Sequence, residues 1–368
     1  MPRQLCLQCD RRFDAPEVWE SAEVTCPHCG QRTLLQPVRI PTSATLKLPP
    51  LTATPGLTME EVAHTAGELI ANVEKVIVGK RTAVEITVAT LLAEGHLLIE
   101  DVPGVAKTML ARALAISAGC TFNRIQCTPD LEPGDVLGQS VLDPKTGRSE
   151  FHFGPLFAQV VLVDEINRSS PRTQAALLEA MGERTVTEGR VTYDLERPFM
   201  LLATQNPIEQ EGTFQLPEAQ LDRFLLRLSL GYPTLAAESE MCERFQLRHP
   251  IETLKSCTTP ERIMACQQTV RTVTVSPAAR DYILAVVHAT RRHPDLLLGA
   301  SPRGSLGLLR MAQAKAALQG RDAVSLSQIR ELVAPVLRHR LLVQRNRPDL
   351  QADAVLAEIL QQLPSPAI

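Results

Sequence analysis

The sequence lacks the long apolar run of a membrane-spanning protein. No stretch of its 368 residues reaches the roughly 18 consecutive apolar residues that a spanning helix needs. Residues 1–13 carry charges where a secretory signal peptide has its apolar segment. We therefore expect a soluble, cytoplasmic protein with no membrane insertion.

An excess of charge of either sign is also missing. The formal net charge is −3, so no global electrostatic field attracts nucleic acid or an anionic membrane surface. Apolar residues make up 44% of the chain and charged residues 21%, which is ordinary for soluble globular proteins and argues against disorder. The length predicts two or three domains.

A proline-rich segment divides the chain. Residues 37–58 contain five prolines and no sustained apolar period, which predicts a semi-extended linker. This linker separates a small module at residues 1–36 from an α/β core at residues 59–232. The strand signals fade after Tyr232, so we expect residues 233–368 to form a helical lid domain.

The predicted core alternates helical patterns with short apolar runs. Such runs are typical of strands that are buried on both faces of a parallel sheet, and five are present: residues 96–100, 122–126, 160–164, 199–204 and 224–229. Two β-prone arms around Glu188 and Gly189 predict a hairpin at residues 185–195. In the lid, amphipathic helices are expected at residues 302–319 and 327–344.

A candidate phosphate-binding loop follows the first predicted strand, at residues 101–108. Pro103 and Gly104 form the turn, and Lys107 and Thr108 open an Ala/Leu-rich helix. Backbone N–H groups at a helix start surround phosphate oxygens, while a lysine adds a cation and a threonine a magnesium ligand. Asp101 and Ala106 occupy the two glycine positions of the strict pattern, so the match alone is weak.

A pair of carboxylates strengthens this prediction. Asp164 and Glu165 end a buried apolar run, where charged groups are costly unless they have a task. Asp164 could hold Mg²⁺ at the terminal phosphates of ATP, and Glu165 could polarise the attacking water. The alternative is an acidic pair that caps the next helix.

Four sequence blocks carry a resemblance to a known family. They are EDVPGVAKT, VVLVDEINRSSPRTQAALLEAM, ATQNPIEQEGTFQLPEAQLDRF and GASPRGSLGLLRMAQAKA, in this order. Over roughly residues 59–363 the chain resembles the MoxR-type AAA+ ATPases. The resemblance implies a P-loop NTPase core with a parallel sheet and a C-terminal helical lid.

The resemblance also assigns roles to individual residues. It implies that Asn206 orients water, that Arg223 is an arginine finger acting on a neighbouring subunit's ATP, and that Arg303 is a second sensor reaching the nucleotide from the lid. Val78 and Gly79 match the segment that contacts adenine. The predicted catalytic residues are Glu165, Asn206 and Arg223. The predicted ATP ligands are Val78, Gly79, Pro103, Gly104, Val105, Ala106, Lys107, Thr108, Asp164 and Arg303, with Thr108 and Asp164 also holding Mg²⁺.

Further properties are implied only by the family. Its members commonly form rings, often hexamers, and work with partners that carry von Willebrand factor A domains. The inserted segment at residues 138–154 and the hairpin near Gly189 would then face the pore or the client protein.

Four N-terminal cysteines predict a structural zinc site. Cys6, Cys9, Cys26 and Cys29 form two Cys-x-x-Cys pairs with the spacing of a tetrahedral four-thiolate site. A module of this size buries too little surface to fold without a metal or crosslink. The pattern resembles a zinc ribbon, a scaffold that binds protein or nucleic acid.

Three hypotheses about function follow. The first is an ATP-hydrolysing chaperone that remodels or matures a client protein, with the zinc ribbon as its recruiting arm. The second is a nucleic-acid-directed regulator; it is less favoured because residues 1–58 hold six Lys or Arg against five Asp or Glu. The third, a nucleotide-binding scaffold without hydrolysis, is disfavoured by the presence of Glu165 and Arg223.

Overall fold

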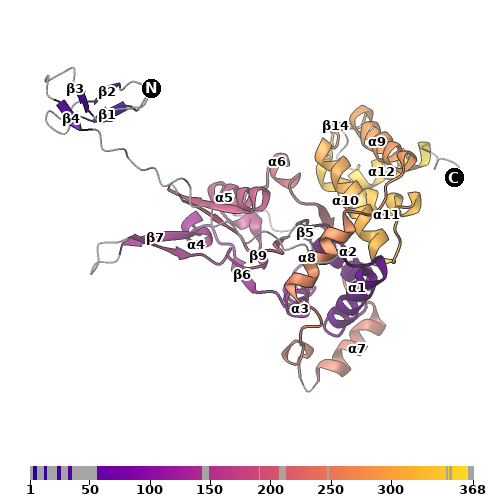
Figure 1. Ribbon diagram of the computed structural model, residues 1–368. Helices are drawn as coiled ribbons and strands as arrows, with labels where there is room; N and C mark the ends of the chain where they lie inside the picture. The colour runs from indigo at the N-terminus through magenta and orange to yellow at the C-terminus, as the bar shows by residue number, and fades with distance from the viewer. Residues whose placement is uncertain are drawn as a thin grey trace.

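The computed structural model of the protein describes most of the chain after the predicted linker (Figure 1). The residues that it describes are 56–142, 149–189, 191–206, 213–246, 248–344, 347 and 350–363, together with four short N-terminal strands.

The N-terminal strands form two antiparallel pairs. Strand β1 (Arg3–Leu5) pairs with β2 (Arg12–Asp14), and β3 (Glu23–Thr25) pairs with β4 (Arg32–Leu34). In the sequence, each Cys-x-x-Cys pair falls between the two strands of one hairpin. The zinc site stays a prediction because its four cysteines lie outside the described residues: Cys6, Cys9, Cys26 and Cys29.

A five-stranded parallel sheet forms the centre of the core, as the apolar runs predicted. Its order is β13-β5-β12-β9-β6, and every pairing within it is parallel. The strands lie within two residues of the predicted runs: β5 (Leu97–Glu100), β6 (Phe122–Gln126), β9 (Val160–Asp164), β12 (Met200–Gln205) and β13 (Leu226–Leu228). The non-consecutive order requires helical crossovers between strands.

Alternation along the strands divides the interior into two cores. Leu97 and Ile99 of β5 belong to one hydrophobic cluster, whereas Leu98 between them belongs to the other. In the same way, Val160 and Val161 of β9 face opposite clusters. Successive side chains of a strand point to opposite faces, so a sheet covered on both sides needs apolar residues at every position.

Helices cover both faces of the sheet. Side chains of α1 (Met59–Glu74), α2 (Arg81–Leu92) and α3 (Lys107–Ser117) join the first core. The second core includes residues of α4 (Pro133–Leu137) and α5 (Pro171–Glu183). The result is the α/β architecture that the sequence predicted.

Two hairpins project from the core. The first pairs β7 (Gly138–Leu142) with β8 (Ser149–Phe153), and the second pairs β10 (Thr185–Glu188) with β11 (Val191–Asp194), as predicted at residues 185–195. Aromatic side chains join them, because the Phe151 ring stacks on Tyr193 with centroids 4.4 Å apart.

The C-terminal part is mainly helical. In Figure 1 its orange and yellow helices gather at one end of the molecule, next to α2 and β5. The helices are α7 (Leu235–Phe245), α8 (Pro260–Val270), α9 (Pro277–Arg292), α10 (Pro302–Leu318), α11 (Leu326–Leu337) and α12 (Ala352–Gln362), with short 3-10 turns at Pro250–Glu252 and Arg338–Arg340. Four of the described helices begin with a Ser or Thr cap followed by proline, at Ser170, Thr259, Ser276 and Ser301.

The predicted helix at residues 327–344 is too long. Helix α11 ends at Leu337, and Arg338–Arg340 forms a 3-10 turn. The reason is that His339 and Arg340 are buried and bond to the Phe224 carbonyl of the core, which turns the chain away from the helix axis. Beyond the turn, β15 (Leu342–Val343) pairs with β14 (Leu296–Leu298).

The division between core and lid at residue 232 stays a prediction. Helix α8 lies after this point in the sequence but packs on the core helices: Gln267 Nε2 donates to Leu91 O of α2 at 2.8 Å, and Arg262 Nε donates to Thr65 Oγ1 of α1 at 2.9 Å. Within the described residues, no helix is both long and apolar enough to cross a bilayer.

Two buried histidines make stability depend on pH. His96 donates from Nε2 to Met181 O and accepts the Leu201 N–H at Nδ1. Burial, aided by the charge of Arg184, lowers the pKa of His96 to about 4. Burial and Arg340 lower the pKa of His339 as well. Below the ordinary histidine pKa, the unfolded chain therefore binds protons that the folded chain does not.

We expect the melting temperature to fall as the pH is lowered from 7 to 5. Through each buried histidine, the free energy of unfolding falls by up to about 1.4 kcal/mol for each pH unit in this window. Thermal denaturation across this range should give a shallower slope for His96→Gln than for the wild type. His64→Gln is the control, because His64 is exposed and should keep the wild-type slope. Equal slopes in all three proteins would contradict the assignment.

Candidate nucleotide site and arginine-lined cavity

The predicted phosphate loop joins the end of β5 to the start of α3. Gly104 has φ +85°, and a Cβ built there meets no further heavy atom within 4 Å, so the loop borders open space. Helix α3 begins at Lys107, with Thr108 as its second residue. The unpaired N–H groups of a helix start favour an anion, and the geometry therefore suits phosphate.

Asp101, the first departure from the glycine pattern, clamps the loop. Its carboxylate is buried, and Oδ2 accepts hydrogen bonds from Ser229 Oγ (3.1 Å), Leu230 N (2.6 Å) and Gly231 N (2.7 Å). Its main-chain oxygen accepts from Lys107 Nζ at 2.8 Å. One residue thus ties the phosphate loop to the segment that follows β13.

Ala106, the second departure from the glycine pattern, has a backbone conformation that is typical of glycine. Its φ of +62° and ψ of +25° lie in the left-handed region, which costs a non-glycine residue roughly 1–2 kcal/mol. The methyl group is partly buried against the first core, which offsets part of this strain. The loop therefore keeps the glycine conformation without the glycine.

Asp164 ends β9 and Glu165 follows it, at the same edge of the sheet. Thr204 of β12 holds both: its Oγ1 donates to Asp164 Oδ1 at 2.6 Å and accepts the Glu165 N–H at 2.8 Å. Arg124 of β6 donates to Asp164 Oδ2 from Nη2 at 2.7 Å. Because β9 lies between β12 and β6, its terminal carboxylate contacts both neighbours.

The Glu165 side chain is held separately. Oε2 accepts from Gln126 Nε2 at 3.0 Å and from Arg168 Nη1 at 3.1 Å. The residue has φ +56°, a strained backbone that bends the chain sharply after β9. This bend aims the Asp164 and Glu165 carboxylates at different partners.

The predicted water-orienting residue Asn206 and the predicted adenine segment also lie near this edge. Asn206 directly follows β12 and is buried, while the Asp101 N–H donates to Gln205 O at 3.2 Å. Gly79 packs closely on α7, since a Cβ there would lie 2.5 Å from Ala237 Cβ. Lys80 donates to Tyr232 O at 2.7 Å, which brings the predicted adenine segment, Val78 and Gly79, close to the Asp101 clamp.

Arg223 and Arg303 lie at the opposite edge. They line a cavity of about 490 Å³ together with residues that precede β5, such as Gly95 and His96. Arg223 itself precedes β13, and its Nη1 donates to Leu178 O of α5 at 2.6 Å. The structure therefore does not bring either arginine together with Lys107 of the same chain.

The cavity is strongly cationic. Two carboxylates line it, Glu94 and Asp222, and each pairs with an arginine. Burial acts to raise the pKa of Glu94, but the hydrogen bonds and charges of Arg184 and Arg271 outweigh it and lower the pKa. The arginines of the cavity are Arg184, Arg223, Arg271, Arg303, Arg310 and Arg340. This lining suits a highly charged anion such as a nucleotide phosphate.

Two family models match the chain. Residues 96–226 match the ATPase family associated with various cellular activities (AAA), and residues 288–359 match the AAA lid domain. Neither match includes the N-terminal module.

Known relatives extend over most of the sequence. The chain is 45% identical to the uncharacterised protein YeaC of Bacillus subtilis over 309 residues, 83% of this chain and 97% of that protein. It is 39% identical to the chaperone MoxR1 of Mycobacterium tuberculosis, covering 83% of each. The chain belongs to the MoxR family of AAA ATPases. A crystal structure of an ATPase candidate from Cytophaga hutchinsonii agrees, with a TM-score of 0.78 at 34% identity, covering 84% of this chain and 97% of that one.

Membership of the MoxR family confirms the predicted fold and leaves individual site roles as predictions. Sequence reasoning missed several residues that the structure places in the site. Thr204, Arg124 and Gln126 contact the two carboxylates, and Asp101 clamps the loop. Their position in the sequence could have indicated them, because Gln126 and Thr204 lie at or near the carboxyl ends of the strands that flank β9.

Replacing each departure by glycine should weaken ATP binding at Asp101 but change stability little at Ala106. Asp101→Gly leaves the Ser229 hydroxyl and the backbone N–H groups of Val102, Leu230 and Gly231 without their acceptor, so we expect ATP affinity to fall roughly tenfold or more. Ala106→Gly relieves backbone strain but loses the methyl contact and gains unfolded-state entropy, so stability should change by less than about 1 kcal/mol. Titration with a fluorescent ATP analogue and thermal melting measure both effects.

Asn72→Ala provides the matched control for Asp101→Gly. Asn72 is buried, and its Nδ2 donates to Ser117 Oγ and Lys255 O away from the loop. This variant should melt at a lower temperature yet bind ATP normally. Wild-type affinity in Asp101→Gly would show that the clamp does not shape the phosphate site.

Proposed function

We propose that this MoxR-family protein hydrolyses ATP with Mg²⁺ in a homo-oligomeric ring and uses the energy to remodel a client protein. The observation that carries the proposal is the division of the site between two edges. The phosphate loop and the carboxylates lie at the carboxyl ends of the strands, whereas Arg223 and Arg303 lie at the amino ends.

ATP would be held mainly by backbone groups of this chain. In the proposal, the loop N–H groups of Gly104, Val105 and Ala106, next to Pro103, surround the phosphates. Lys107 exchanges its contact with Asp101 O for phosphate oxygens. Val78 and Gly79 contact the adenine.

Thr108 and Asp164 suit Mg²⁺, because both offer the hard oxygen atoms that this ion prefers. Over the part of the chain that the structure describes, no three His, Cys, Asp or Glu side chains group as metal ligands. In proteins Mg²⁺ is commonly held by one or two carboxylates together with the phosphates of its nucleotide. When bound, Mg²⁺ neutralises charge that develops on the phosphates.

Glu165 is the proposed base, and Asn206 orients the water. A carboxylate oxygen of Glu165 accepts a proton as water attacks the terminal phosphate. The contacts from Gln126 and Arg168 support this role, because both hold the same carboxylate oxygen, Oε2, and so fix the position of the carboxylate.

Glu165→Gln separates binding from hydrolysis. We expect this variant to bind ATP within about threefold of the wild type and to lose turnover by about 100-fold or more, because an amide cannot accept the proton. Nucleotide titration and phosphate release measure the two quantities. Glu179→Gln, at an exposed position of α5, is the control and should leave both unchanged. Turnover retained in Glu165→Gln would remove this residue from the proposed role.

The arginine-lined cavity supports hydrolysis between subunits. Strand β5 spans four residues, at about 3.3 Å each, between the cavity and the phosphate loop of the same chain. We infer that Arg223 and Arg303 reach the ATP of a neighbouring subunit. A ring, in which every subunit donates one edge and receives the other, satisfies all sites at once.

Mixing two inactive variants tests this arrangement. Arg223→Ala and Lys107→Ala should each lose at least about 100-fold in turnover, since an arginine finger contributes on the order of 10³–10⁵. In an equal mixture, roughly a quarter of the interfaces pair an intact loop with an intact arginine. Phosphate release should therefore recover in part. No recovery at any ratio would argue against a finger acting between subunits.

The client role is inferred from the family. The relative MoxR1 carries the name of a chaperone. We extend this to the present chain, with a hexamer as the proposed ring and a von Willebrand factor A domain protein as the proposed partner. The N-terminal module, with zinc bound by Cys6, Cys9, Cys26 and Cys29, would recruit the client.

A further inference from the structure

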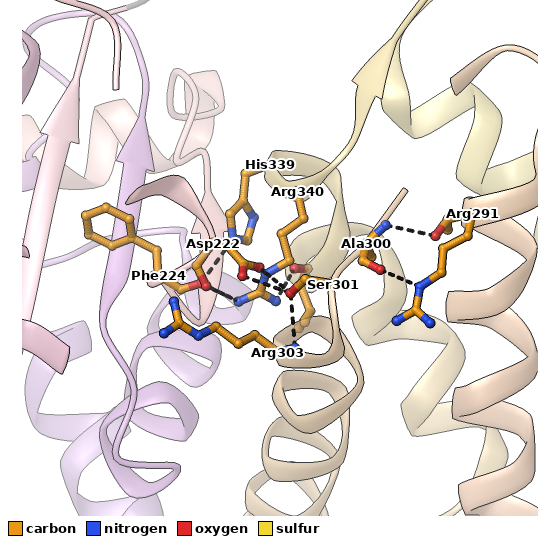
Figure 2. A network of polar contacts seen from close by, with 10 residues as sticks. Asp222, Phe224, Arg291, Ala300, Ser301, Arg303, His339 and Arg340 are labelled. Atoms are coloured by element: carbon orange, nitrogen blue, oxygen red, sulfur yellow. Dashed lines mark hydrogen bonds and ion pairs between the residues drawn. The ribbon is translucent and has the colours of Figure 1, made fainter. Parts of the chain in front are cut away.

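The residues on both sides of Arg223 are held by a single arginine of the lid. The Arg340 side chain is 3% exposed, and its Nη2 donates to the backbone oxygens of Phe224 at 2.6 Å and Asp222 at 3.3 Å. Its Nε lies 3.1 Å from Asp222 Oδ1, as an ion pair. Figure 2 shows the Arg340 guanidinium directed at these two residues. The segment that carries Arg223 is therefore fixed at three points.

Two other lid residues strengthen this contact. Ser301 Oγ lies 2.8 and 3.0 Å from the two carboxylate oxygens of Asp222 and accepts the Arg303 N–H at 3.0 Å (Figure 2). The neutral His339 donates from Nε2 to Phe224 O at 3.0 Å. The start of α10, with Arg303, thus shares one hydrogen-bond network with the segment around Arg223.

Helix α10 leaves room for the Arg340 side chain. A Cβ at Gly307 would lie 3.1 Å from Arg340 Nη1, and one at Gly304 would lie 3.6 Å from Arg340 Cδ. Burial lowers the pKa of Arg340 to about 10, and Asp222 opposes this shift, so the guanidinium stays charged at neutral pH. A buried charge is tolerated only when it is paired, which fixes Arg340 in this position.

We propose that Arg340 is a positioning residue that sets the orientation of Arg223 toward the neighbouring subunit's ATP. The proposal rests on the finger role of Arg223 given above. A guanidinium fork can hold two carbonyls and a carboxylate at once, whereas a lysine ammonium has no fixed fork. Movement of the lid would then change hydrolysis in the neighbouring site and leave the chain's own ATP binding intact.

Arg340→Lys tests the proposal because it keeps the charge and removes the fork. We expect ATP affinity within about twofold of the wild type and turnover reduced by roughly tenfold or more. Mixing with Lys107→Ala should restore turnover as in the Arg223→Ala mixture, because the Lys107→Ala subunits supply a well-positioned finger. A merely structural defect would not be rescued in this way.

Arg330→Lys is the matched control. Arg330 lies on α11 and donates to Tyr282 Oη, Leu360 O and Leu363 O, all within the lid. It should melt at a lower temperature but hydrolyse ATP normally. If Arg340→Lys does not assemble, Ser301→Ala releases the Asp222 carboxylate with Arg340 in place, and a smaller loss with the same rescue is expected.

The outcomes separate the two proposals. Normal turnover in Arg340→Lys and Ser301→Ala, or a loss that Lys107→Ala subunits do not rescue while Arg223→Ala is rescued, overturns the positioning role alone. Absence of rescue in the Arg223→Ala mixture overturns the finger and, with it, the role of Arg340.

Discussion

The common direction of the five core strands decides at which edge of the sheet the main predicted site residues lie. The carboxyl ends of β5, β9 and β12 meet at one edge of the sheet, which brings together the phosphate loop, Asp164 and Asn206. The amino ends of β5 and β13 meet at the other edge, next to Arg223 and Arg303. The strands separate these edges, so the two predicted sets of groups lie at opposite ends of the sheet within one chain. The proposed hydrolysis between subunits follows from this topology.

The parts of the fold that the sequence predicts are those with a local signal. Strands such as β9 are buried on both faces, so they require an unbroken apolar run, and such a run is visible directly in the sequence. Asp164 and Glu165 end that run, and a carboxylate pair at a buried strand end is conspicuous because it is costly. Helix α10 was equally predictable, since its apolar period begins at the Ser301 cap and the following proline.

The parts that could not be predicted depend on contacts between distant segments. Thr204 reaches Asp164 across 40 positions, Asp101 reaches Leu230 across 129, and Arg340 reaches Phe224 across 116. No periodicity encodes such pairs, so Asp101 is recognisable in the sequence only as a missing glycine. The same contacts explain the wrong end of α11: the amphipathic pattern continues past Leu337, but the buried polar side chains that follow are drawn to the core.

Strand β13 connects the two halves of the site. It has three residues, Leu226–Leu228, and pairs only with β5 within the described sheet. The segment before it is held by the buried cation of Arg340, and the segment after it by the buried carboxylate of Asp101. Both charges bond backbone groups, so they fix the path of the chain on the two sides of the strand. A strand this short, bonded firmly at both ends, has little freedom to absorb a displacement. A shift of the phosphate loop at one end would therefore be felt at Arg223 at the other, so this strand links a subunit's own predicted ATP site to the finger that it is proposed to offer to its neighbour.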